Sequence, residues 1–122
     1  MDIQEIKELF IEEANEYLSV LENNLKFMQS SLDEVSDDLI CETYRAAHSI
    51  KGTSAFLALK DISELSKAME YKMMPWRDKE ATPNLKDIKT LLEAYDILKN
   101  MIDNLEENKQ TDISNIIKQL NI

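Results

Sequence analysis

The chain has 122 residues, a length that suits one domain with a sizeable buried core. Acidic residues number 24 against 14 basic ones, and the net charge of −10 argues against partners such as nucleic acid or anionic lipid. One glycine and two prolines are too few for a turn-rich β fold. The only cysteine, Cys41, excludes an intrachain disulfide.

Hydrophobic periodicity predicts a first helix over residues 2–28. Its apolar residues recur at steps of three and four, as on one face of a helix: Ile3, Ile6, Phe10, Ala14, Tyr17, Leu21, Leu25 and Met28. Residues 29–33 read as a loop, and Ser36 or Asp37 can cap a second helix. The inner face of that helix is predicted to carry Ile40, Tyr44, Ala47, Ile50 and Ser54.

Three further helices are expected. Asp61 and Glu64 have the spacing of a capping box, which predicts the start of a third helix with the stripe Ile62, Leu65, Met69 and Met73. Residues 75–81 interrupt the pattern, and Thr82-Pro83 resembles an N-cap followed by proline at the first helical position. The fourth stripe is Leu85, Ile88, Leu91, Leu92, Tyr95, Leu98, Ile102 and Leu105. Thr111 or Asp112 is expected to open a short fifth helix with Ile113, Ile116, Ile117 and Leu120.

Short connections between amphipathic helices favour antiparallel neighbours. We therefore predict an all-α fold, an antiparallel up-down four-helix bundle with an additional short C-terminal helix. No apolar run approaches the roughly 20 residues that cross a bilayer, and the acidic start lacks a signal-peptide core. We expect no membrane insertion and a cytoplasmic location.

The only histidine, His48, lies on one strip of the second helix with Cys41, Arg45, Lys51, Gly52 and Ala55. This strip is offset from the apolar face, so His48 is expected to face solvent or a shallow groove. Arg45 and Lys51 make it locally positive. Gly52 costs a helix roughly 1 kcal/mol relative to alanine, and such a small residue would let a partner surface approach His48.

The run Arg45-Ala-Ala-His-Ser-Ile-Lys-Gly52 resembles the signature of histidine phosphotransfer domains, and specifically that of the N-terminal domain of CheA-type chemotaxis histidine kinases. The resemblance extends to the opening residues and to the five-helix layout, which implies that residues 1–122 form a single histidine phosphotransfer domain. Members tend to carry glycine three and six residues after the motif glycine, where this chain has Ala55 and Ala58, and Phe56 is bulkier than usual.

The resemblance implies that an ATP-binding kinase domain phosphorylates His48, which passes the phosphoryl group to an aspartate of a response regulator. It assigns Lys51 as a phosphate-side cation and places Glu70 as the acidic partner that orients and activates His48. Arg45, Gly52 and Lys67 are expected to face partners, although Lys67 could instead pair with Glu70.

No cofactor or metal is expected in this domain, because ATP and Mg²⁺ would belong to partner domains. The chain would then be the phosphorylatable part of a transferase and would not be catalytically autonomous. Two alternatives stay open at this point. One is a phosphotransfer domain of another sensor kinase or phosphorelay, and the other is a helical interaction module without chemistry.

Overall fold

The computed structural model describes residues 1–107 and 110–122, which form α-helices and short 3-10 turns with no strand among them. The all-α prediction is confirmed. The elements in chain order are α1 (Ile3–Ser30), η1 (Leu32–Glu34), α2 (Asp37–Phe56), α3 (Lys60–Arg77), α4 (Leu85–Asp103), η2 (Leu105–Glu107) and α5 (Ser114–Leu120). None of the described helices is both long and apolar enough to cross a membrane.

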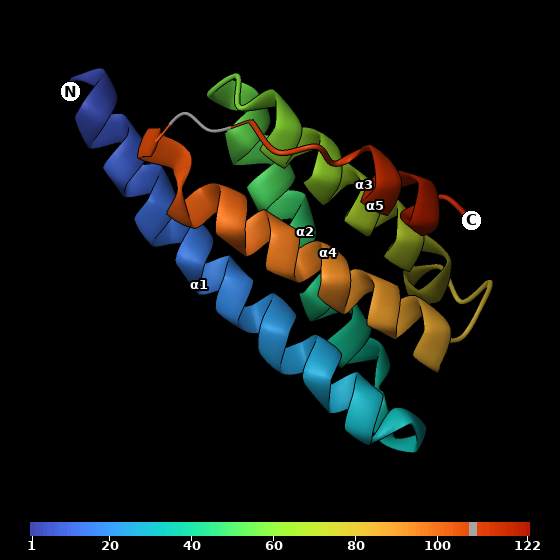
Figure 1. The fold of residues 1–122 in the computed structure, drawn as a ribbon. Helices are drawn as coiled ribbons and strands as arrows, with labels where there is room; N and C mark the ends of the chain where they lie inside the picture. The colour runs from blue at the N-terminus through green and yellow to red at the C-terminus, as the bar shows by residue number, and fades with distance from the viewer. Residues whose placement is uncertain (108–109) are drawn as a thin grey trace.

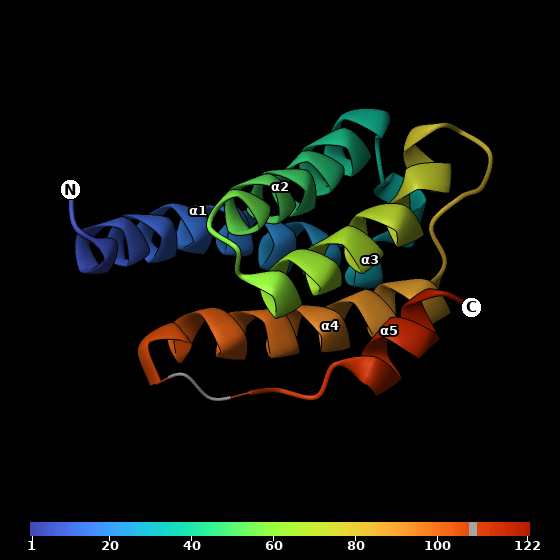
Figure 2. The same cartoon turned by 90° about the horizontal axis from the view of Figure 1, so that it is seen from above.

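The first four helices run alternately up and down, and α5 lies along the outside of α3 and α4 (Figures 1 and 2). Helix α1 packs against α2 and α4, while α3 packs against the same two helices from the other side. The predicted four-helix bundle with a short fifth helix is therefore confirmed. Its closest pairing joins α2 to α3, the two helices that carry His48 and Glu70.

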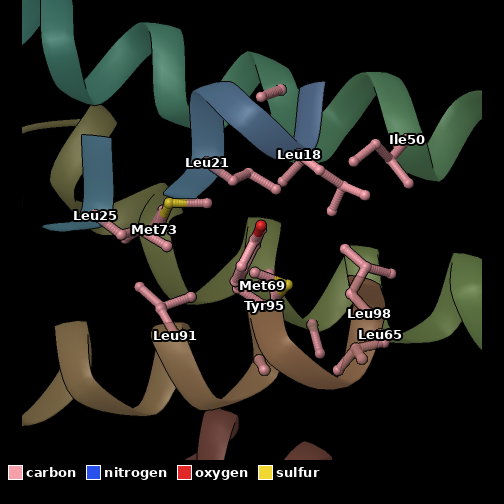
Figure 3. Packing of buried hydrophobic residues seen from close by; sticks show 14 of the residues in the cluster. Leu18, Leu21, Leu25, Ile50, Leu65, Met69, Met73, Leu91, Tyr95 and Leu98 are labelled. Atoms are coloured by element: carbon pink, nitrogen blue, oxygen red, sulfur yellow. The ribbon is translucent and has the colours of Figure 1, made fainter. Parts of the chain in front are cut away.

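The core is continuous between the four long helices (Figure 3). Fully buried side chains come from every one of them and include Leu18, Leu21, Leu25, Ile50, Leu65, Met69, Met73, Leu91 and Leu98. Burying one such side chain stabilises a fold by about 1.5–3 kcal/mol. Because α2 and α3 are both fixed to this core, the side chains on their outer edges are held at a constant separation.

Helix α2 begins and is oriented as the sequence predicts. The Ser36 hydroxyl accepts a hydrogen bond from the backbone N–H of Leu39, so Ser36 is the N-cap. All five residues of the predicted inner face, from Ile40 to Ser54, are buried. The opposite strip, which contains His48, is left at the surface.

The predicted capping box at Asp61 and Glu64 is wrong. Helix α3 begins earlier, at Lys60, with Leu59 as a cap that makes no side-chain hydrogen bond. The cause is a tight turn in which Ala58 has φ 59°. In this turn the Leu59 N–H donates to the Ser54 carbonyl, and the Ala58 N–H donates to the Ala55 carbonyl. This pattern is the Schellman motif that ends many helices, and it leads the chain directly into α3.

The predicted boundaries of the next two helices also need correction. Helix α3 does not stop at Pro75 but continues to Arg77, because a proline in the last turn loses one hydrogen bond while the next residue, Trp76, is buried in the core.

Helix α4 is capped by Asn84 and not by Thr82. The Asn84 side-chain oxygen accepts from Asp87 N–H, and its amide donates back to the Asp87 carboxylate. Helix α5 begins at Ser114, after the Asp112 carboxylate has accepted the Ser114 N–H. Thr82 and Thr111 therefore cap neither helix.

Candidate functional site

Three side chains of α2 meet around one carboxylate of α3, that of Glu70. Glu70 Oε1 lies 3.2 Å from His48 Nδ1 and accepts a hydrogen bond of 2.8 Å from the Tyr44 hydroxyl. The other oxygen, Oε2, lies 2.8 Å from Lys51 Nζ. Tyr44, His48 and Lys51 are spaced by one helical turn each along α2, so they form a row facing Glu70 on α3.

Glu70 is 3% exposed, a rare position for a carboxylate unless it is paired. Burial alone favours the neutral acid and would raise its pKa. Hydrogen bonds from Lys51, Tyr44 and His48 outweigh that effect and hold the pKa of Glu70 below its usual value. The group is therefore a carboxylate at neutral pH, able only to accept hydrogen bonds.

This carboxylate determines how a neutral imidazole at His48 must be protonated. The nitrogen that faces an acceptor-only group carries the hydrogen, so Nδ1 is the donor and Nε2 keeps its lone pair. The His48 side chain is 57% exposed, and no hydrogen bond engages Nε2 among the described residues. The expectation that His48 faces solvent is confirmed, and Nε2 is the ring nitrogen that is open to an incoming group.

The structure thus brings together three of the predicted site residues, His48, Lys51 and Glu70. Arg45 and Gly52 are exposed on the same helix as His48. Lys67 does not pair with Glu70, because its ammonium group lies over the ring of Tyr71, 5.4 Å from the centroid. Lys51 is the cation that contacts the Glu70 carboxylate beside His48.

Tyr44 was predicted only as a core residue, and its part in the site was missed. Its ring stacks on His48 with centroids 6.1 Å apart and an angle of 16° between the planes. The Arg77 guanidinium carbon lies 4.4 Å from the centroid of the Tyr44 ring. One signal was available in the sequence: a buried tyrosine hydroxyl needs a hydrogen-bond partner, and Tyr44 stands one turn before His48.

The described residues hold no group of three His, Cys, Asp or Glu side chains that could bind a metal ion. The sequence has no glycine-rich phosphate loop, since Gly52 is its single glycine. What the site offers is one oriented nucleophile on an open surface, with a carboxylate behind it and a cation beside it.

The sequence matches the family described as "Hpt domain" over residues 5–108. The chain belongs to the Hpt domain family. A curated relative, the chemotaxis protein CheA of Listeria monocytogenes, is 32% identical over 117 residues, which is 93% of this chain. The chain spans only 18% of the length of that relative.

Solved structures give the same fold for this Hpt domain. The phosphorylated P1 domain of CheA3 from R. sphaeroides, solved in complex with CheY6, superposes with a TM-score of 0.87 at 22% identity, covering 98% of this chain and 94% of that one. The solution structure of a histidine phosphotransfer domain of CheA superposes with a TM-score of 0.82 at 20% identity. The match covers 98% of this chain and 92% of that one. The family predicted from the His48 motif is confirmed.

Proposed function

We propose that this Hpt domain carries a phosphoryl group on His48 Nε2 between an ATP-binding histidine kinase domain and an aspartate of a response regulator in chemotaxis signalling, in the cytoplasm. The observation that carries the proposal is the geometry at one imidazole ring. Nδ1 faces a buried carboxylate while Nε2 belongs to a side chain that is 57% exposed. The CheA3 domain of similar fold was captured phosphorylated and bound to CheY6, a precedent for such an exchange.

The chemistry follows from these two nitrogens. The Nε2 lone pair attacks the γ-phosphorus of ATP, the bond to the β–γ bridging oxygen breaks, and ADP leaves with that electron pair. Positive charge develops on the ring, and Glu70 stabilises it through the Nδ1–H bond. In the second step a carboxylate oxygen of the regulator attacks phosphorus, the P–N bond breaks, and its electrons return to Nε2.

The remaining residues are assigned from their positions. Lys51 has three N–H donors, so it can hold Glu70 and also donate to an incoming phosphoryl oxygen. Arg45, Gly52 and Lys67 lie on exposed faces of α2 and α3, where a partner would dock. ATP and Mg²⁺ would be held by the kinase and regulator domains, so this domain would not be an enzyme on its own.

An exposed phenylalanine extends the docking surface. Phe56 is 87% exposed, two helical turns beyond His48, and Gly52 lies between them. Two turns of helix measure about 11 Å. A typical interface buries about 800 Å² per partner, so a domain centred on His48 would cover Phe56.

The test uses the kinase core of a CheA-type protein without its own phosphotransfer domain, supplied with labelled ATP. Wild type is expected to gain label that is lost in acid, as phosphohistidine is, while His48→Gln stays unlabelled. The buried Trp76 reports by fluorescence whether both proteins are folded. A non-catalytic interaction module predicts no label on either protein, and equal labelling of His48→Gln would also refute the proposal.

A further inference from the structure

The Tyr44 hydroxyl is the polar group of the site that the proposed function leaves without a role. Tyr44 is 7% exposed, and its hydroxyl lies 2.8 Å from Glu70 Oε1, the same oxygen that faces His48 Nδ1. One carboxylate oxygen therefore accepts from both the phenol and the imidazole. The second oxygen is held separately by Lys51.

The direction of the Tyr44 hydrogen bond is fixed by chemistry. A carboxylate only accepts, so the phenol must donate and must keep its proton. Burial, and then the nearby Glu70 carboxylate, raise the pKa of Tyr44 above its ordinary value, although Arg77 acts in the opposite direction. The phenol therefore stays protonated throughout the neutral range and remains a donor whenever Glu70 is ionised.

The Tyr44 ring has little freedom to move this donor away. It is stacked on the imidazole and contacted by the Arg77 guanidinium group. Arg77 is itself held by an ion pair of 2.9 Å with Asp78 at the end of α3. The phenol oxygen is thus fixed by contacts from both helices that form the site.

We propose that Tyr44 is a positioning residue for the phosphorylation of His48, which it serves by fixing Oε1 of Glu70 against Nδ1. The inference rests on the proposed function. With Lys51 on one oxygen and Tyr44 on the other, the carboxylate is held in one orientation, which keeps Oε1 against Nδ1. Without the phenol, Glu70 keeps only the Lys51 anchor, and the tautomer that leaves Nε2 free is less strongly favoured.

The test compares Tyr44→Phe with Tyr95→Phe. Phenylalanine keeps the stacked ring and removes only the hydroxyl. Tyr95 is the matched control, because it is also buried, at 3% exposure, but lies on α4 with its hydroxyl near Glu22. Any loss caused by deleting a buried hydroxyl in general appears in both variants, and their urea midpoints measure that loss.

Two readouts separate positioning from stability. Imidazole ¹⁵N NMR is expected to show the Nδ1–H tautomer in wild type and Tyr95→Phe, with an increased Nε2–H fraction in Tyr44→Phe. The maximal phosphorylation rate of Tyr44→Phe should fall roughly three- to tenfold, because Glu70 keeps its charge and its Lys51 anchor and loses only its alignment, with the KM for this domain unchanged. Within a Glu70→Gln background the same substitution should have no further effect on the rate.

An unchanged tautomer ratio in Tyr44→Phe would overturn the inference, as would an equal rate loss in Tyr95→Phe or full additivity with Glu70→Gln. The NMR measurement needs no phosphorylation. If His48 were never labelled, the proposed function would fail while the positioning of Glu70 by Tyr44 would still be decided.

Discussion

Lys51 Nζ lies 2.8 Å from Glu70 Oε2, so the cation predicted to serve the phosphate also neutralises a buried carboxylate in the unphosphorylated domain. Lys51→Met should leave that oxygen without a donor and lower the free energy of unfolding by about 1–3 kcal/mol. Urea denaturation measures the loss. The control is Lys60→Met, whose partner Glu64 is 3.9 Å away at the exposed surface, and which should cost less than about 0.5 kcal/mol. Equal losses in the two variants would show that the Lys51 pair contributes no more to stability than an exposed pair does.

Removing the charge of Glu70 tests its activating role. In Glu70→Gln the amide still fills the site but no longer stabilises positive charge on the ring. Charged hydrogen bonds contribute about 1.5–3 kcal/mol, so the rate of phosphorylation should fall roughly ten- to hundredfold. Single-turnover labelling with a kinase core measures this rate. A rate equal to that of wild type would remove Glu70 from the mechanism and leave His48 as the acceptor.

A substitution at Gly52 tests stability and partner docking separately. A Cβ added at this position would meet nothing within 4 Å, so alanine fits without a clash. Gly52→Ala should therefore stabilise the domain by about 0.5–1 kcal/mol, because alanine favours the helix. If Gly52 is kept for close approach of a partner, the same variant should show a higher KM for phosphotransfer. A more stable protein with unchanged transfer would mean that Gly52 has no docking role.

Ala58 adopts φ 59°, a conformation that is costly for a residue with a Cβ. Ala58→Gly should raise the free energy of unfolding by about 0.5–1 kcal/mol, the relief of strain being partly offset by greater entropy of the unfolded chain. Ala55→Gly is the matched control. Ala55 lies inside α2, so this variant should lower the free energy of unfolding by about 0.5–1 kcal/mol. Thermal denaturation distinguishes the two, and destabilisation by Ala58→Gly would contradict the Schellman turn.

An ion pair between α3 and α4 predicts a pH dependence of stability. Burial would raise the pKa of Asp87, but hydrogen bonds from Asn84 and Lys72 outweigh it, and the pKa is lowered. A group with a lowered folded-state pKa contributes stability above its unfolded pKa and loses it as pH falls through the folded value. Asp87→Asn should therefore lower the free energy of unfolding by about 1 kcal/mol at pH 7 and leave it unchanged near pH 2.

Asp103→Asn is the control for this experiment, because its partner Lys99 forms an exposed pair with it. That variant should stay within about 0.5 kcal/mol of wild type at neutral pH. Urea midpoints across the pH range compare the three proteins. A cost of Asp87→Asn that is as large at pH 2 as at pH 7 would contradict the ion-pair account.

Periodicity predicted the helices and most of their buried positions, although Ile3 and Leu85 of the predicted stripes are exposed and Leu105 lies beyond the end of α4. The buried face from Ile40 to Ser54, the solvent-facing strip of His48 and the cap at Ser36 all follow from spacing and side-chain chemistry. The boundaries that failed depend on backbone conformation. Nothing in the residue types around Ala58 requires a left-handed turn, and that turn moves the start of α3 away from the apparent capping box at Asp61.

The site was partly predictable for a similar reason. The spacing of Arg45, His48 and Lys51 on one helix is visible in the sequence, whereas contacts between helices are not. The bond from Tyr44 to Glu70 joins residues 26 positions apart, and it depends on how α2 and α3 pack. Periodicity assigned Tyr44 to the core, where its ring does lie, but gave no partner for its hydroxyl.

The central claim is that Nε2 of His48 is the phosphorylated atom, and correlated ¹H–³¹P NMR of the labelled domain tests it most directly. Phosphorus on Nε2 neighbours two ring carbons that each carry a hydrogen, so it should couple to both Hδ2 and Hε1. Phosphorus on Nδ1 has only one such neighbour and would couple to Hε1 alone. Coupling to both hydrogens is the result we predict. Coupling to Hε1 alone would contradict the account, because Nδ1 is the nitrogen that faces Glu70.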